Sequence, residues 1–221
     1  MKYRLACSAA LLFAASLPLQ LNASTFDFNF AGPGVSGTVQ LTYGTATDAK
    51  YPQAYEITGV SGWFSDTNNG LNIVNAPIGA LQPIVHSTPD ATNLLAPHDF
   101  SRFAVASGLG PQSGGFLTFD NLYWPTGSVQ TASDYPGAGG IFDIYGLMFT
   151  IGNGTVVDVW SNGGSNHVDY GVGVATATNA LDYVGGGVSV TPEPEPFALL
   201  GLGLSALLIW RGRRASGQNS L

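Results

Sequence analysis

FDFNF at positions 26–30 is the stretch that decides the fold, because aromatic and polar residues alternate along it. Side chains on a β-strand point alternately to opposite faces, so this period of two predicts a strand with one buried face. Val35, Val39, Leu41 and Tyr43 share one parity and predict a second strand of the same kind. The first two predicted strands therefore lie directly after the apolar N-terminal stretch of the chain.

Similar patterns recur downstream, at 55–64, 115–123, 141–151, 155–160, 168–174 and 184–190. The segment 141–151 is apolar on both parities, which predicts a strand covered on both faces. Asn153 and Gly154 tolerate positive φ and predict a hairpin turn. Roughly eight to ten short strands, with few charged residues for exposed helix faces, predict an all-β chain. We expect a single β-sandwich, with the jelly roll as a candidate topology.

One segment, 75–97, interrupts this rhythm with prolines at 77, 83, 89 and 97. Proline cannot donate a ladder hydrogen bond, so a central strand is not expected here. The segment is instead predicted to be a long ordered loop that either covers a sheet or carries a binding site.

The C-terminal region, residues 191–221, has a different composition. A proline-rich segment at 192–196 precedes an apolar run at 197–210, which Arg211, Arg213 and Arg214 close. This order predicts a membrane helix that stops at charges on the cytoplasmic side. The prolines predict an extended stalk between helix and domain. Because the run is shorter than the roughly 20 residues of a full span, we expect a temporary anchor.

This order of Pro-Glu-Pro, Gly-rich apolar helix and Arg cluster resembles the PEP-CTERM sorting region of Gram-negative bacteria. In that resemblance Pro192, Glu193 and Pro194 form the sorting motif, although a register two residues later also fits. The resemblance implies export and recognition by an exosortase, a membrane cysteine transpeptidase that cleaves near the motif. It further implies anchoring in the inner membrane before processing, then the cell surface or an exopolysaccharide matrix. It covers only residues 191–221.

The N-terminus has the pattern of a secretory signal peptide. Lys2 and Arg4 are followed by an apolar stretch at 5–17 and by a cleavage site after Ala23. The expected division is therefore a signal peptide at 1–23, an ectodomain at 24–190 and a sorting region at 191–221. Cys7 lies within the signal peptide, so the mature chain lacks disulfides, thiolate nucleophiles and Cys-ligated metals.

Charge restricts the class of partner. The ectodomain has only Lys50 and Arg102 as bases, against eleven aspartates and Glu56, and the whole chain has a net charge of -7. A nucleic-acid partner is not expected, because a polyanion requires a basic surface. Neutral sugar hydroxyls or a calcium ion suit such a surface better, but an acidic surface that serves only solubility is the favoured explanation.

Catalytic and metal-binding motifs are absent from the sequence. It has no nucleophile elbow, no His-Glu-x-x-His and no phosphate-binding loop, so we expect neither an enzyme nor a cofactor. His86, His98 and His167 lack the spacing of metal ligands, and no metal site is predicted. The segment 66–70 resembles a calcium loop for three positions, but an Asx-type turn is the stronger prediction.

Two alternatives involve specific side chains. A carbohydrate-binding module would use a flat aromatic ring, for which the candidates are Trp63, Trp124 and Trp160. Trp124, in a turn-like stretch before Pro125, is the best of these three candidates for an exposed ring, although tryptophan is more often buried. A secreted hydrolase would use facing carboxylates, for which the candidates are Asp143, Asp158 and Asp169. The sequence favours an exported, non-enzymatic surface or matrix protein over both.

Overall fold

The computed structural model describes residues 23–110, 114–164 and 166–193. This part of the chain forms β-strands and one short 3-10 helix, which confirms the all-β prediction. The elements are β1 (Ser24–Gly32), β2 (Val35–Thr47), β3 (Tyr55–Asp66), η1 (Asn68–Gly70), β4 (Ile73–Pro77), β5 (Ser101–Ala104), β6 (Phe116–Phe119), β7 (Leu122–Tyr123), β8 (Leu147–Gly152), β9 (Thr155–Gly163), β10 (Asp169–Ala175) and β11 (Ala180–Pro192).

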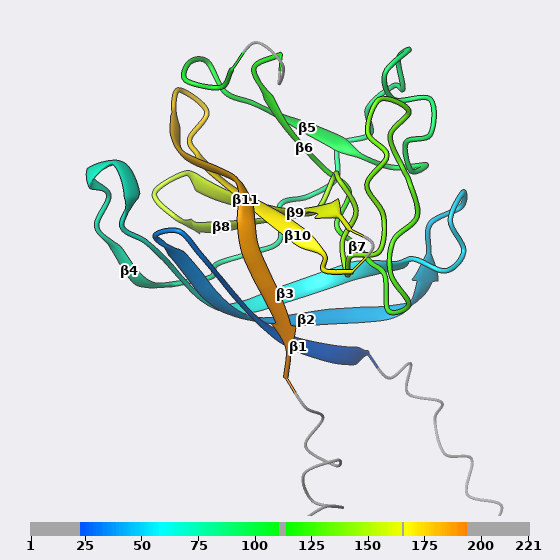
Figure 1. The fold of residues 1–221 in the computed structure, drawn as a ribbon, viewed down its shortest axis with the longest axis horizontal. Coiled ribbons are helices and arrows are strands. Elements are labelled where there is room, and N and C mark those ends of the chain that lie inside the picture. The colour runs from blue at the N-terminus through cyan, green and yellow to red at the C-terminus, as the bar shows by residue number, and fades with distance from the viewer. Residues whose placement is uncertain (1–22, 111–113, 165, 194–221) are drawn as a thin grey trace, which may run out of the picture.

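The main sheet is antiparallel and follows the path β4-β3-β2-β1-β11-β10-β9-β8 (Figure 1). β7 pairs with β3, while β5 and β6 form a separate hairpin. The segment after β4 reaches the free edge of β8. Gly79 N donates to Thr150 O at 2.7 Å, and Gln82 N donates to Met148 O at 2.9 Å. These bonds nearly close the sheet into a barrel.

A single curled sheet therefore replaces the two facing sheets of the expected sandwich. Alternation of apolar and polar residues requires only that one face of each strand be covered. A sandwich and a barrel both meet that requirement. Whether the sheet closes into a barrel depends on the hydrogen bonds that residues 79–82 make with β8. The sequence of this segment has no period of two, so these bonds were not predicted.

The barrel interior holds the residues that the alternating pattern predicted. Phe28, Val39 and Leu41 are fully buried in one apolar cluster. The ring of Phe28 meets the edge of Phe142 with 5.5 Å between centroids. A second cluster lies on the outer face of β8 and β9, where the β5–β6 hairpin contributes Leu117 and covers that face. β8 is thus covered on both faces, as its sequence indicates.

Two strand predictions need correction. The predicted strand at 141–151 begins only at Leu147, and residues 141–146 form an irregular segment that still buries Phe142 and Tyr145. The predicted strand at 115–123 is divided into β6 and β7. In both segments apolar residues are buried by tertiary contacts without forming one continuous ladder. Asn153 and Gly154 have φ of 53° and 71°, which confirms the predicted turn between β8 and β9.

The described chain begins and ends at the same end of the barrel. Phe28 on β1 pairs with Pro192 at the end of β11, and Glu193 N donates to Asp27 O at 2.9 Å. The β5–β6 hairpin lies at the opposite end (Figure 1). The predicted signal peptide up to residue 22, Pro194, the apolar run and the three C-terminal arginines lie outside the described residues. Within the described part, no helix has the length and apolar character needed to cross a membrane.

Candidate functional site

A pocket of about 500 Å³ opens on the outer side of the barrel, between β9, β11, the β5–β6 hairpin and two loops. Small-molecule sites usually have volumes of about 300–1,000 Å³. Val157 and Val159 face the barrel interior, so the residues that alternate with them on β9, Asp158 and Trp160, face outward into this pocket. Other lining residues are Asp90, Thr92, Asn93, Arg102, Phe116, Thr118, Asp134, Tyr135, Tyr145 and Tyr183.

Aromatic rings form one wall of the pocket. Trp160 is 6% exposed and lies over Gly171, where an added Cβ would come within 2.2 Å of the indole Cζ2. Its Nε1 donates to Asn162 Oδ1 at 3.0 Å, which fixes the ring. Tyr183 on β11 stacks against Trp160 with centroids 5.3 Å apart, yet it remains 58% exposed. Tyr183 is therefore held in place by its stack on Trp160, while much of its side chain stays exposed to solvent.

Asp158 is the buried polar group of the pocket. It is 2% exposed, and its Oδ1 is buried with no hydrogen-bond partner. Burial, followed by the charge of Asp143, raises the pKa of Asp158 well above its ordinary value, which favours the neutral acid. A neutral carboxyl group can both donate and accept a hydrogen bond.

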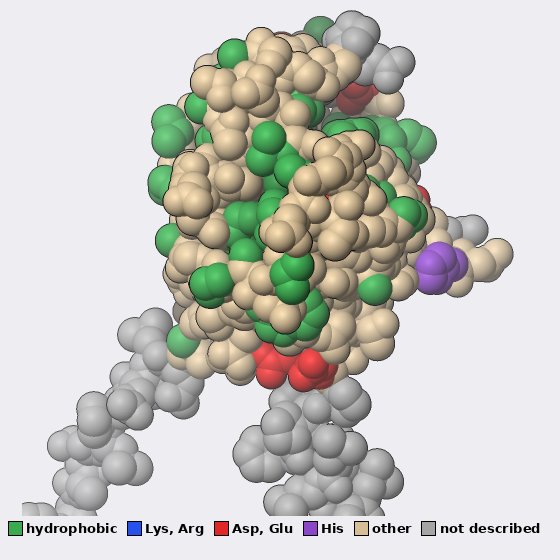
Figure 2. All heavy atoms as spheres, turned by 90° about the vertical axis from the view of Figure 1, so that its left-hand side faces the viewer, with side chains coloured by type: hydrophobic (Ala, Val, Ile, Leu, Met, Phe, Trp, Pro, Cys, Tyr) green, Lys and Arg blue, Asp and Glu red, His purple; other side chains and the backbone are tan. Residues whose placement is uncertain are grey.

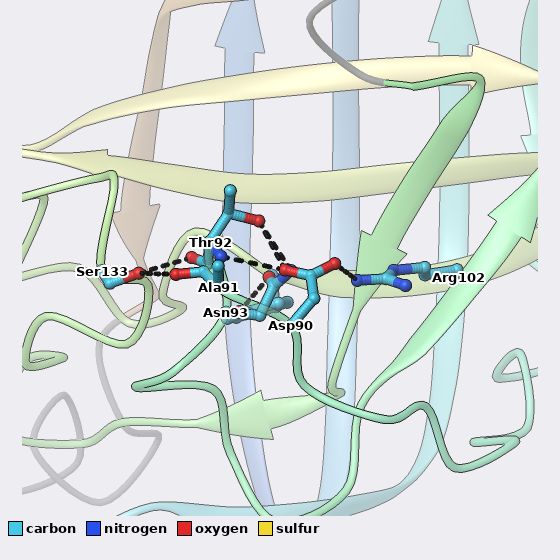
Figure 3. A network of polar contacts seen from close by, with 7 residues as sticks. Asp90, Ala91, Thr92, Asn93, Arg102 and Ser133 are labelled. Atoms are coloured by element: carbon cyan, nitrogen blue, oxygen red, sulfur yellow. Dashed lines mark hydrogen bonds and ion pairs between the residues drawn. The ribbon is translucent and has the colours of Figure 1, made fainter.

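A polar network fixes the rim of the pocket (Figure 3). Arg102 Nη2 lies 2.9 Å from Asp90 Oδ2, so the charge of the arginine is compensated. Asp90 Oδ1 also accepts hydrogen bonds from Thr92 Oγ1 and Asn93 Nδ2, both at 2.7 Å. These bonds, with that from Arg102, lower the pKa of Asp90. Ser133 lies in the loop between β7 and β8, and its Oγ donates to Thr92 O at 2.8 Å. This bond joins that loop to the 75–97 segment. The predicted 75–97 loop thus contributes directly to the pocket.

The tryptophan expected to bind a ligand does not line this pocket. Trp124 is 0% exposed and packs against Tyr51, Ala54 and Leu122, so its choice as the best candidate for an exposed ring is wrong. Because β7 pairs with β3, the residues directly before Trp124 are held against the barrel. Trp63, on β3, is 36% exposed and is not among the described residues that line the pocket. Trp160 was among the predicted candidates and Tyr183 was not, because its only signal in the sequence is an aromatic residue next to the predicted last strand.

The three aspartates considered for hydrolysis do not come together in the pocket. Only Asp158 lines it. Asp169 Oδ1 accepts a hydrogen bond from Gly187 N at 2.7 Å, which gives it a structural role at the β11 bulge. Asp143 is 1% exposed and is paired with Asp120, also buried. Asp90 and Asp134, neither of which was a candidate for hydrolysis, are the other two carboxylates among the described lining residues.

His86 and the calcium-like loop have partners within the protein. His86 Nδ1 lies 2.7 Å from Asp99 Oδ1. Asp66 Oδ1 accepts from Asn68 N at 2.8 Å, which confirms the Asx-type turn. The Nδ2 atoms of Asn68 and Asn69 each donate to the Asp182 carboxylate at 2.8 Å. Among the residues that the structure describes, no group of three His, Cys, Asp or Glu side chains could hold a metal ion.

The first two residues of the predicted sorting motif are attached to the sheet. β11 continues through Pro192, two residues beyond the expected domain boundary. Asn29 Nδ2 donates to Glu193 Oε1 at 2.8 Å, while Asn29 Oδ1 accepts a hydrogen bond from Thr38 Oγ1. The predicted extended stalk therefore does not begin at Pro192, because this residue and Glu193 are held on β1.

Replacing Asn29 with aspartate should loosen this attachment. Asn29→Asp keeps the acceptor for Thr38 but places a carboxylate beside Glu193, and surface charge pairs contribute about 0.2–1 kcal/mol. We expect hydrogen exchange of the Glu193 amide to be roughly two- to fivefold faster, and that of Val190, in the middle of the ladder, to be unchanged. The double variant Asn29→Asp/Glu193→Gln should restore slow exchange. Equal exchange at Glu193 in all three proteins would contradict this role of Asn29.

No family model matches the chain, and neither a curated protein nor a solved structure matches it. Function is therefore inferred from the residues of this chain and from their geometry.

Proposed function

We propose that this protein is an exported cell-surface or exopolysaccharide-matrix protein, sorted through its C-terminal region by an exosortase. The observation that carries the proposal is the order of Pro192, Glu193 and Pro194, the apolar run at 197–210 and the arginine cluster. In this function the chain is non-enzymatic and needs no cofactor. The membrane is a transient partner, and the exopolysaccharide is the material in which the ectodomain resides.

Two features of the ectodomain support the proposal. β1 starts and β11 ends at the same end of the barrel, so the predicted leader and the predicted anchor attach on one side (Figure 1). On the face shown in Figure 2, no Lys or Arg side chain is visible, whereas acidic side chains gather at the lower end. A surface of this charge suits an extracellular protein and gives no attraction to nucleic acid.

Intact-mass analysis of the protein from membrane, surface and medium tests the proposal. We expect the membrane fraction to lack residues 1–23, and the surface or medium fraction to lack the apolar run as well. Two matched variants distinguish the registers of the motif. Glu193→Ala should block the second cleavage if the motif is 192–194, and Glu195→Ala should block it if the motif lies two residues later. Retention of the apolar tail in every fraction of the unmodified protein would overturn the proposal.

A further inference from the structure

The pocket beside β9 combines the exposed ring of Tyr183, a buried carboxyl group on Asp158 whose Oδ1 has no hydrogen-bond partner, and Arg102, whose charge is compensated by Asp90. We propose that this pocket binds a neutral saccharide, with Tyr183 as the stacking surface and Asp158 as a hydrogen-bond partner for a sugar hydroxyl. This assignment goes beyond the proposed function, which gives the ectodomain no ligand. It concerns a different surface from the sorting region.

Stacking is the first part of the argument. The C–H face of a pyranose ring is apolar and packs on aromatic rings, which present large, rigid surfaces at low entropic cost. Tyr183 is 58% exposed and its position is fixed by the stack on Trp160, itself held over Gly171. A preorganised ring loses little freedom when a ligand covers it. Phe116, 40% exposed, adds a second apolar surface in the same pocket.

Hydrogen bonding is the second part. A sugar hydroxyl both donates and accepts, so its best partners do the same. Asp158 Oδ1 is buried and has no hydrogen-bond partner, and a buried oxygen that is left unsatisfied destabilises the free protein. A bound hydroxyl would satisfy it. Thr92 and Thr118 supply further neutral groups around the same space.

Charge decides between saccharides and charged ligands. Arg102 is the only basic side chain among the described lining residues, and its ion pair with Asp90 at 2.9 Å compensates its charge. An anionic ligand would also meet Asp134 and Asp158. Burial favours the neutral form of Asp158 and Arg102 compensates Asp90, so among the described lining residues only Asp134 would attract a cation. A neutral ligand therefore fits best.

The position of the pocket allows access to a polymer. Its β5–β6 wall lies at the end of the barrel opposite the point where the described chain begins and ends (Figure 1). An anchor attached at that point would leave this wall of the pocket at the far end of the barrel from the membrane. Binding to the saccharide does not require the sorting route, so the two proposals can fail separately.

Binding is tested with the full chain in a polyoxyethylene detergent, because glucoside detergents would compete. The probes are immobilised gluco-, manno-, galacto- and xylo-oligosaccharides, with oligogalacturonate and chitosan oligosaccharides as charged counterparts. We expect binding to at least one neutral series and weaker binding to its charged counterparts. Absence of binding to every neutral probe would overturn the assignment, as would preference for either charged probe.

Matched variants identify the site. Tyr183→Ala should weaken binding about tenfold, whereas Tyr183→Phe, which keeps the ring, should stay within about threefold. Asp158→Leu should weaken it about three- to tenfold, and Asp158→Asn should largely restore it. Trp63→Ala, on a ring outside the pocket, should bind like the unmodified protein. Near-UV circular dichroism checks that each variant is folded. Binding that survives Tyr183→Ala, or that disappears in Trp63→Ala, would overturn the assignment.

Discussion

Phe28→Ala is expected to lower the free energy of unfolding by about 3–5 kcal/mol. Phe28 is 0% exposed and lies at the centre of the barrel, in contact with the ring of Phe142 at 5.5 Å. Truncation removes the apolar surface of the ring and leaves a cavity that closed strands cannot easily fill. Since domains of this size are stable by about 5–15 kcal/mol, this loss is a large part of the total.

Urea unfolding followed by tryptophan fluorescence measures this effect. Phe116→Ala is the matched control, because Phe116 is 40% exposed on β6 and its removal should cost less than about 1 kcal/mol. Equal losses in the two variants would show that FDFNF does not form the centre of the core.

The second large effect is expected at a pair of buried acids, Asp120 and Asp143. Asp120 Oδ1 accepts from Leu122 N at 3.0 Å, and Asp143 Oδ1 accepts from Tyr145 N at 2.9 Å. Their Oδ2 atoms are buried, and two carboxyl groups can hydrogen-bond to each other only when one carries a proton. The Thr131 hydroxyl also acts on Asp143 as a hydrogen-bond donor. Burial, followed by the charge of Asp143, raises the pKa of Asp120 well above 3.8, and burial also raises that of Asp143.

The sign of the pH dependence follows from proton binding. Below pH 3.8 both folded and unfolded chains hold the proton, and the stabilisation from this group is fully present. As the pH rises, the unfolded chain releases the proton first, and the stabilisation is lost towards the raised pKa of the folded pair. The protein should therefore be more stable at pH 5 than at pH 8. Asp66, whose pKa burial raises to about 6, contributes in the same direction.

Asp120→Asn should reduce this dependence. The amide keeps the acceptor for Leu122 and supplies a permanent donor to Asp143, so we expect a gain of about 1–3 kcal/mol at pH 8 and little change at pH 5. Denaturation curves at the two pH values provide the measurement. Asp134→Asn, at an exposed carboxylate, is the control and should not alter the difference. An unchanged difference in Asp120→Asn would show that the pair does not share a proton.

Several local features could be predicted from the sequence because they depend on neighbouring residues. The alternation at 26–30 identifies β1, and Asn153-Gly154 identifies the hairpin between β8 and β9, where both residues have positive φ. The Asx-type turn at Asp66 was predicted for the same reason. The sorting order at 192–214 is also local and stays a prediction, since most of it lies outside the described residues.

The site could be predicted only in part. Trp160 and Asp158 were both candidates, but for two different functions, since nothing in the sequence shows that they share a pocket. Trp124 was the best candidate for an exposed ring because it precedes a proline, yet the pairing of β7 with β3 buries it. Tyr183 meets Trp160 across β10, and this contact depends on the register of β9, β10 and β11, which an irregularity in the β10–β11 pairing shifts.

The sequence by itself determined the all-β class, the main strand periods, the turns and the acidic charge of this protein, because each arises from short-range stereochemistry or composition. Tertiary structure decided that the sheet curls into a barrel, that residues 79–82 bind its open edge, and that Asp158 and Tyr183 line one pocket. Closure of the sheet and formation of the pocket depend on contacts between residues that are distant in sequence. Alternation of apolar and polar residues shows that one face of a strand is buried, but it does not show which element covers that face.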